Sequence, residues 1–214
     1  MGRQDSTEVT QFVQGLDVSH HQGEVHWRDI ALAGNVFAYV KATEGIEFVD
    51  SRFSVNWMEM KDAGIIRGAY RFFRPSAPVE AQVKGFLTTI GTLAIDDLPP
   101  VLDLEAANTS ADRDEWEALP VEQRMPLALE WLRGVEQAAS RKPIIYTRRG
   151  FVKRCFGSAG GLSDYPLLDR SLYGCVETCR PSRLDRLDDL AVFQPWPSEG
   201  NQLRGRYGQV QWFA

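Results

Sequence analysis

The chain has 214 residues, of which 43% are hydrophobic and 25% charged, a composition typical of a folded globular protein. Its net charge of −5 argues against a nucleic-acid-binding protein and gives no reason to expect binding to anionic membranes. No apolar run approaches the roughly 20 residues needed to span a bilayer. Residues 1–14 are polar, lack the apolar stretch of a secretory signal, and are interpreted as a lead segment.

Short apolar runs alternate with amphipathic segments along the chain. The runs predict buried strands at 15–19 (GLDVS), 36–42 (VFAYVKA), 65–73 (IIRGAYRFF), 100–105 (PVLDLE) and 143–147 (PIIYT). The segments between them predict helices at 53–63, 79–90 and 126–140, the last stopped by a proline. This alternation predicts an α/β fold with a largely parallel sheet, and five strands in the first 150 residues favour a barrel. No glycine-rich loop follows the first strand, which disfavours a dinucleotide-binding fold.

Beyond residue 150 the pattern is weaker. Segments 157–161 and 180–189 are interpreted as loops, and 189–196 and 209–213 as further strands. Because no repeat, low-complexity segment or linker is evident, we interpret 15–214 as a single domain.

The fourth predicted strand carries two carboxylates. Residues two apart in a strand face the same side, so Val101, Asp103 and Glu105 share one face. Repulsion between two neighbouring carboxylates favours one protonated and one ionised group at neutral pH, as cleavage of a glycosidic bond requires. The spacing is equally compatible with an exposed pair bound to arginine or lysine.

Other polar and aromatic residues fall at the ends of the predicted strands. Asp17 alternates with apolar neighbours in the first strand and could face the same cavity as Asp103. Lys41 and Glu44 end the second strand. Aromatic rings suited to sugar faces end the third and fifth strands: Tyr70, Phe72 and Tyr146.

The histidines and cysteines give weaker signals. His20, His21 and His26 lie within seven residues, but their spacing is not that of a metalloprotease motif, so hydrogen bonding or loop structure is favoured over metal binding. The three cysteines, Cys155, Cys175 and Cys179, are interpreted as structural thiols or one incidental bridge. No metal or cofactor is expected.

Five stretches of the chain, taken in order, resemble the motifs of glycoside hydrolase family 25, the Chalaropsis-type lysozymes or N-acetylmuramidases. They are GLDVSHHQGEVHW (15–27), YVKATEG (39–45), GAYRFF (68–73), PVLDLE (100–105) and IIYT (144–147). The resemblance implies an irregular, TIM-like (β/α) barrel in which about five βα units are followed by less regular strands. It also implies hydrolysis of the β-1,4 bond between N-acetylmuramic acid and N-acetylglucosamine.

By position in these motifs, Glu105 corresponds to the general acid and Asp103 to the carboxylate that steadies the reacting sugar, in a substrate-assisted step. Asp17 corresponds to the family's acidic residue on the first strand. Tyr70 and Tyr146 correspond to cleft tyrosines. The implied partner is the peptidoglycan glycan, acted on outside the cytoplasm by a monomer, with an immunity protein if the enzyme is an antibacterial effector.

The chain departs from the family pattern in several places. Arg71 stands where the family usually has histidine, and the aspartate of a final family strand has no counterpart. Trp212 is placed on the family's tryptophan strand, and 167–173 only loosely resembles its sixth strand. The Arg71 change and the missing aspartate leave open a barrel that binds peptidoglycan without cutting it. A separate alternative is an unrelated barrel hydrolase using metal at Asp17, His20 and His26.

Overall fold

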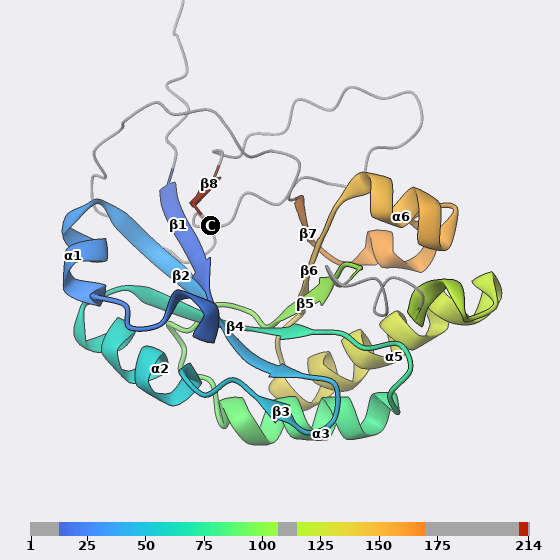
Figure 1. Ribbon diagram of the computed structural model, residues 1–214, viewed down its shortest axis with the longest axis horizontal. Helices are drawn as coiled ribbons and strands as arrows, with labels where there is room; N and C mark the ends of the chain where they lie inside the picture. Colours follow the sequence, from blue (N-terminus) through green and yellow to red (C-terminus); the bar gives the residue numbers. More distant parts are fainter. Residues whose placement is uncertain (1–12, 107–114, 170–209, 214) are drawn as a thin grey trace, which may run out of the picture.

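The computed structural model describes residues 13–106, 115–169 and 210–213 (Figure 1). The strands are β1 (Val13–Val18), β2 (Asn35–Glu44), β3 (Phe48–Val49), β4 (Ile66–Phe72), β5 (Val101–Leu104), β6 (Ile144–Thr147), β7 (Leu167–Asp169) and β8 (Val210–Phe213). The helices are α1 (Trp27–Leu32), α2 (Phe53–Asp62), α3 (Val79–Ile90), α5 (Val121–Ala139) and α6 (Arg149–Phe156), with short 3-10 helices at His20–Gln22 and Gly160–Asp164.

The strands form one curled sheet in the order β7-β6-β5-β4-β2-β1-β8, with β3 paired to the end of β2. Every pair along that path is parallel, and β3 alone runs antiparallel. Helices line the outer side of the curl (Figure 1). Five strands, β1, β2, β4, β5 and β6, are each followed by a helix before the next strand of the path, so the five predicted βα units and the parallel sheet are confirmed.

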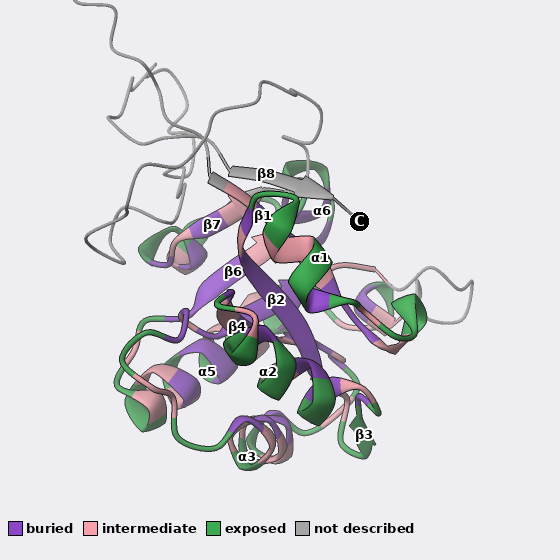
Figure 2. Cartoon of the chain, turned by 90° about the vertical axis from the view of Figure 1, so that its left-hand side faces the viewer, coloured by how far each residue is buried: buried purple, intermediate pink, exposed green. Residues whose placement is uncertain are grey.

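Each face of the sheet has its own apolar layer, because side chains alternate along a strand. The outer layer packs Ala38, Val40 and Leu102 against the helices. The inner layer consists of Phe37, Tyr39, Leu98, Val101 and Ile144, with Tyr70 and Tyr146 packed against it. Strand β2, which contributes to both layers, is buried along most of its length (Figure 2). The sequence alternation thus separates a helix-packing face from a face that lines the inside of the curl.

Two glycines make room for aromatic rings on the inner face. A Cβ atom at Gly15 would collide with the ring of Phe37, and one at Gly68 would collide with the ring of Tyr39. These rings fill the inside of the sheet directly below the strand ends. Glycine is therefore required at both positions by close approach rather than by an unusual backbone angle.

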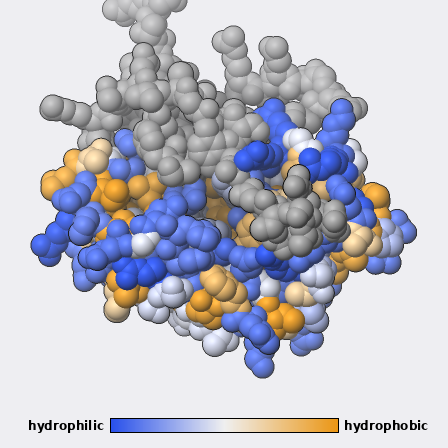
Figure 3. Space-filling view, viewed as in Figure 1, coloured by the Kyte–Doolittle hydropathy of each residue, from blue (hydrophilic) through white to orange (hydrophobic). Residues whose placement is uncertain are grey.

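Hydrophobic residues on the described surface are distributed in small groups. The exposed large side chains come from several separate elements, including Leu32, Met58, Ile95 and Val121. On the face in Figure 3, hydrophobic groups lie within a mainly hydrophilic surface. Such scattering is normal for globular proteins. Among the described residues, no helix has the length and apolar character to cross a membrane.

Several predicted boundaries need correction. The helix predicted to begin at Pro126 begins at Val121 and contains that proline in its second turn, at the loss of one backbone hydrogen bond, the one to the carbonyl of Glu122. Strand β5 ends at Leu104, so Glu105 lies just beyond it. Segment 157–161, predicted as a loop, includes the start of the second 3-10 helix.

Helix 79–90 is confirmed, and the described parts of segments 209–213 and 167–173 form β8 and β7. Cys155 is a buried free thiol in α6. Cys175, Cys179 and the segments 180–189 and 189–196 lie outside the described residues.

Candidate active site

The predicted site residues lie along the carboxyl ends of neighbouring parallel strands, where their positions are set by register. Asp103 on β5 is paired with Phe72 on β4 and with Tyr146 on β6. Two residues before Phe72 on β4, Tyr70 is paired with Lys41 on β2. Residues paired in adjacent strands point to the same face, so this row of side chains lines the inside of the curl. Carboxyl ends of parallel strands are where barrel enzymes carry their active sites.

Tyr70 lies within reach of the charges of acidic residues from separate strands. Its side chain is half-buried against the inner apolar layer, and desolvation is the largest cause that raises its pKa well above the usual 10. The charges of Asp17, Asp103 and Asp50 raise this pKa further, while a hydrogen bond with the Ser19 side chain opposes them. Asp17 on β1, in register with Tyr39, and Asp103 on β5 lie on the same inner face as Tyr70, close enough for their charges to act on its phenol. The structure thus brings together three of the predicted site residues.

Asp103 and Glu105 differ in their surroundings. Asp103 is 7% exposed, between the fully buried Leu102 and Leu104, which face the helices. Glu105 is partly exposed just past the strand, and its Oε1 lies 3.3 Å from Nε of Arg148. The Arg148 side chain is 54% exposed, and ion pairs that involve such exposed groups stabilise a protein by only about 0–1 kcal/mol. The arginine is thus weakly held, whereas the Glu105 side chain itself is only 13% exposed.

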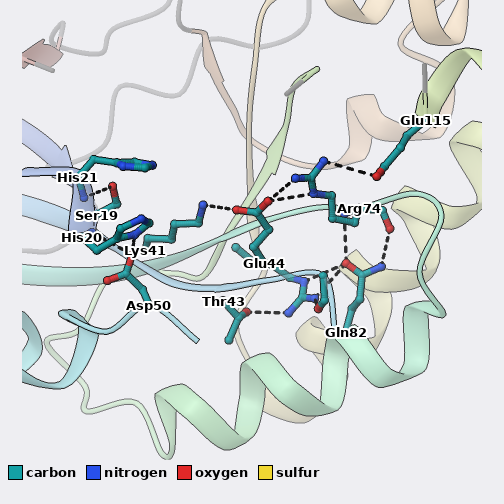
Figure 4. Close-up of polar contacts among 12 residues, drawn as sticks. Ser19, His20, His21, Lys41, Thr43, Glu44, Asp50, Arg74, Gln82 and Glu115 are labelled. Carbon is teal, nitrogen blue, oxygen red and sulfur yellow. Dashed lines mark hydrogen bonds and ion pairs between the residues drawn. The ribbon is translucent and has the colours of Figure 1, made fainter. Parts of the chain in front are cut away.

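A row of charged side chains continues from this site along the ends of β2 and β4 (Figure 4). Lys41 pairs with Glu44, whose Oε1 also accepts from Arg74, with Nη2 at 2.6 Å. Arg74 continues to Glu115 at 3.5 Å. Burial, the largest single influence, raises the pKa of Glu44, but the hydrogen bonds and charges of Lys41 and Arg74 outweigh it and lower the pKa overall. Glu44 is therefore held as a carboxylate between two cations.

The predicted aromatic residues lie beside this row. Phe72 has the Lys41 ammonium and the Arg74 guanidinium each 5.3 Å from its ring centroid, a cation–π arrangement. Tyr146 is half-buried against the inner apolar layer, level with Asp103. Trp212 pairs through its backbone with Gly15, toward the start of β1, and its side chain lies outside the described residues.

Asp50 is a site residue that sequence reasoning missed. It is 3% exposed and accepts from the backbone N–H of His20 at 2.9 Å, while Nδ1 of His20 lies 2.7 Å from the same oxygen. It also accepts from the backbone of Arg52 at 2.9 Å. The His20 ring in turn contacts His21 and Phe48, at centroid distances of 4.0 and 5.4 Å. A lone aspartate after a two-residue strand carries no sequence signal for this anchoring role.

The histidines do not assemble with the acids into a metal site within the described ranges. No group of three or more His, Cys, Asp and Glu residues there is arranged to hold an ion. His20 is engaged with Asp50, which agrees with the hydrogen-bonding interpretation. His26 precedes α1 and lines a separate groove between α1 and α2 with Trp27 and Glu59.

The fold and the strand-end residues define a protein of the α/β-barrel class with a carboxylate-lined site. The chain belongs to the family described as glycosyl hydrolases family 25, whose model matches residues 16–168. The resemblance found in the sequence is therefore confirmed.

Individual relatives agree with this assignment. Lysozyme M1 of Streptomyces globisporus is 38% identical over 157 residues, covering 72% of this chain and 52% of that protein. The crystal structure of a bacterial lysozyme from Streptomyces coelicolor is 35% identical and superposes with a TM-score of 0.70, covering 81% of this chain and 80% of that one. The structure of a muramidase from Acremonium alcalophilum is 30% identical, with a TM-score of 0.66 over 72% of this chain and 74% of that one. The chain spans about half the length of the first curated relatives it matches.

Proposed function

We propose that the protein is a muramidase that hydrolyses the β-1,4 bond between N-acetylmuramic acid and N-acetylglucosamine in peptidoglycan. The observation that carries the proposal is the placement of Asp17, Tyr70 and Asp103 on the inner face of neighbouring strands, with the charges of both aspartates acting on the Tyr70 phenol and Glu105 just beyond the end of β5. Similar proteins are named lysozyme or N,O-diacetylmuramidase, which supports the same chemistry.

The carboxyl groups of Asp103 and Glu105 suit different steps of the hydrolysis. Glu105, beyond the strand and partly exposed, protonates the glycosidic oxygen as the bond to the muramic acid anomeric carbon breaks. Asp103, buried at the strand end, orients the sugar's N-acetyl group so that its carbonyl oxygen attacks the same carbon. Water then opens the cyclic intermediate, with Glu105 accepting the water's proton. Carboxyl groups two residues apart at one strand end leave little room for a direct nucleophile on the opposite side of the sugar from the acid, which favours this substrate-assisted route.

The remaining residues bind and orient the glycan in this proposal. Asp17 completes the acidic wall around Tyr70, whose raised pKa keeps the phenol a hydrogen-bond donor. Phe72 and Tyr146 offer rings to sugar faces, and Lys41 with Glu44 supplies polar contacts further along the cleft. Trp212 is proposed as a further contact on the β8 side.

Incubation of the purified protein with peptidoglycan, followed by mass analysis of the fragments, tests the bond that is cut. New reducing ends on N-acetylmuramic acid are expected, with retained anomeric configuration. Glu105→Gln is expected to lower the rate by roughly 10²–10⁴-fold. The exposed Glu59→Gln on α2 is the matched control and is expected to retain activity. Glycan binding without any product would instead identify a non-catalytic binding barrel.

The substrate places the proposed action at the bacterial cell wall, outside the cytoplasm. We propose that the protein acts there as a monomer, in one domain that spans 15–214. An immunity protein is a proposed partner if the enzyme is delivered against competing bacteria.

A further inference from the structure

Arg71 is a fully buried cation on the outer face of β4. Its Nη1 donates to Oγ1 of Thr43 at 2.6 Å, its Nη2 to Oε1 of Gln82 at 3.0 Å, and its Nη2 also to the carbonyl of Gly45. Burial lowers its pKa to about 10, an effect that the charge of Glu44 partly offsets, so the guanidinium is charged at neutral pH. Burying such a charge is costly unless its donors are satisfied, which they are here by neutral oxygens at the end of β2 and on α3.

Gln82 of α3 is fixed in turn. Its Nε2 donates to the carbonyls of Arg74 and Ala77, at 2.8 and 3.0 Å, and its Oε1 accepts from the backbone of Arg74 at 3.2 Å. The Gln82 side chain that accepts from the guanidinium is therefore itself held in place by hydrogen bonds. The guanidinium connects α3 to the end of β2 through a rigid acceptor.

The end of β2 is irregular at the point where Arg71 holds it. Lys41 is paired with Tyr70, but Thr43 is paired with Arg71, so the register shifts and Ala42 is the extra residue. An extra residue reverses the alternation of side chains beyond it. Ala42 packs in the outer layer, and Thr43 also turns outward to Arg71. Glu44 thereby returns to the inner face beside Lys41, three residues away, and the two form an ion pair.

We propose that Arg71 is a positioning residue of the cleft, which locks this bulge and the following turn so that Glu44 and Lys41 are presented to the glycan. The proposal rests on the function proposed above. Arg71 itself faces the helices and does not touch the sugar, so it acts through Glu44. Its loss is expected to weaken glycan binding while leaving the acid at Glu105 in place.

The test is a double-mutant cycle between Arg71→Lys and Glu44→Gln, with KM and kcat measured on soluble glycan fragments. Lysine keeps the charge but cannot form the forked contacts. Arg71→Lys is expected to raise KM by roughly tenfold with kcat nearly unchanged, and to raise it little further when Glu44→Gln is already present. Thr43→Val, which removes one acceptor at little change in volume, is expected to raise KM in the same direction.

Arg124→Lys is the matched control, because Arg124 of α5 is also buried and donates to the backbone carbonyls of Leu119, Cys155 and Glu117. It is expected to lower the unfolding temperature without changing KM. An equal effect of Arg71→Lys in both backgrounds, or a fall in kcat at unchanged KM, would overturn the positioning role. If the wild-type protein neither cleaves nor binds glycan, the proposed function fails as well.

Discussion

The contact between Gly68 and the ring of Tyr39 allows a prediction whose size follows from the structure. An alanine Cβ at residue 68 would lie 2.8 Å from Cζ of Tyr39 and closer still to two other ring carbons. The ring has little room to move, because it is 5% exposed and its hydroxyl donates to the carbonyl of Pro99 at 3.1 Å. Gly68→Ala must therefore displace either the ring or β4.

Two effects of opposite sign decide the outcome. Overpacking of a core costs about 1–3 kcal/mol. Replacing glycine by alanine also reduces the freedom of the unfolded chain, which stabilises the protein by about 0.4–1 kcal/mol where the backbone fits. Overpacking dominates, so we expect a net destabilisation of about 1–2 kcal/mol. At about 2–4 °C per kcal/mol for a chain of this size, the midpoint falls by several degrees.

Urea unfolding and thermal unfolding measure this change. The control is Gly150→Ala in α6, where nothing lies within 4 Å of the added Cβ and the same substitution should stabilise the helix by up to about 1 kcal/mol. Because Gly68 precedes Tyr70 by one inward-facing position, Gly68→Ala should also lower kcat/KM. Equal stabilisation by both substitutions would refute the packing argument.

The remaining predictions concern charged groups and the phenol of the site. Because the pKa of Glu44 is lowered on folding, its contribution to the free energy of unfolding is present above the ordinary carboxyl pKa and is lost as the pH falls through the lowered value. When unfolding is measured at decreasing pH, Glu44→Gln should therefore lose less stability than the wild type. Identical curves for the two proteins would contradict this. Asp50→Asn should destabilise the protein by about 1–3 kcal/mol in urea unfolding, because an amide has a single acceptor oxygen and cannot accept from His20 and from the Arg52 backbone N–H as the two carboxylate oxygens do; unchanged stability would remove its anchoring role. Because its pKa is raised, Tyr70 stays protonated, so the alkaline limb of kcat/KM should be the same in Tyr70→Phe as in the wild type. A strong chelator should leave the rate unchanged, as the proposed steps use only carboxyl groups and water, and inhibition reversed by added metal would count against them.

Much of the site was predictable because strand ends are visible in the sequence. An apolar run that ends in Asp103 or Tyr146 identifies both a strand and the residue at its carboxyl end. Parallel pairing then brings those ends to one edge, whatever the lengths of the connecting helices. The helix at 79–90 was equally clear, since its apolar residues repeat at helical spacing and a proline precedes it.

Other features had no local signal. The anchoring of His20 by Asp50 joins residues 30 apart in the chain, and the ion pair of Glu105 with Arg148 joins two different strand ends. The start of α5 was misplaced because its proline was read as a boundary, whereas buried residues on both sides of it, Arg124 before and Trp131 after, pack the helix into the fold.

The amino-acid sequence by itself determined the strands, most of the helices and the residues that end each strand, because these depend on periodicity within a few neighbouring positions. Tertiary structure decided which face those residues take and what they contact. Lys41 and Glu44 would point to opposite faces in a regular strand, and they meet only because the chain bulges at Ala42. That bulge is held by an arginine on another strand, an interaction set by packing between distant segments.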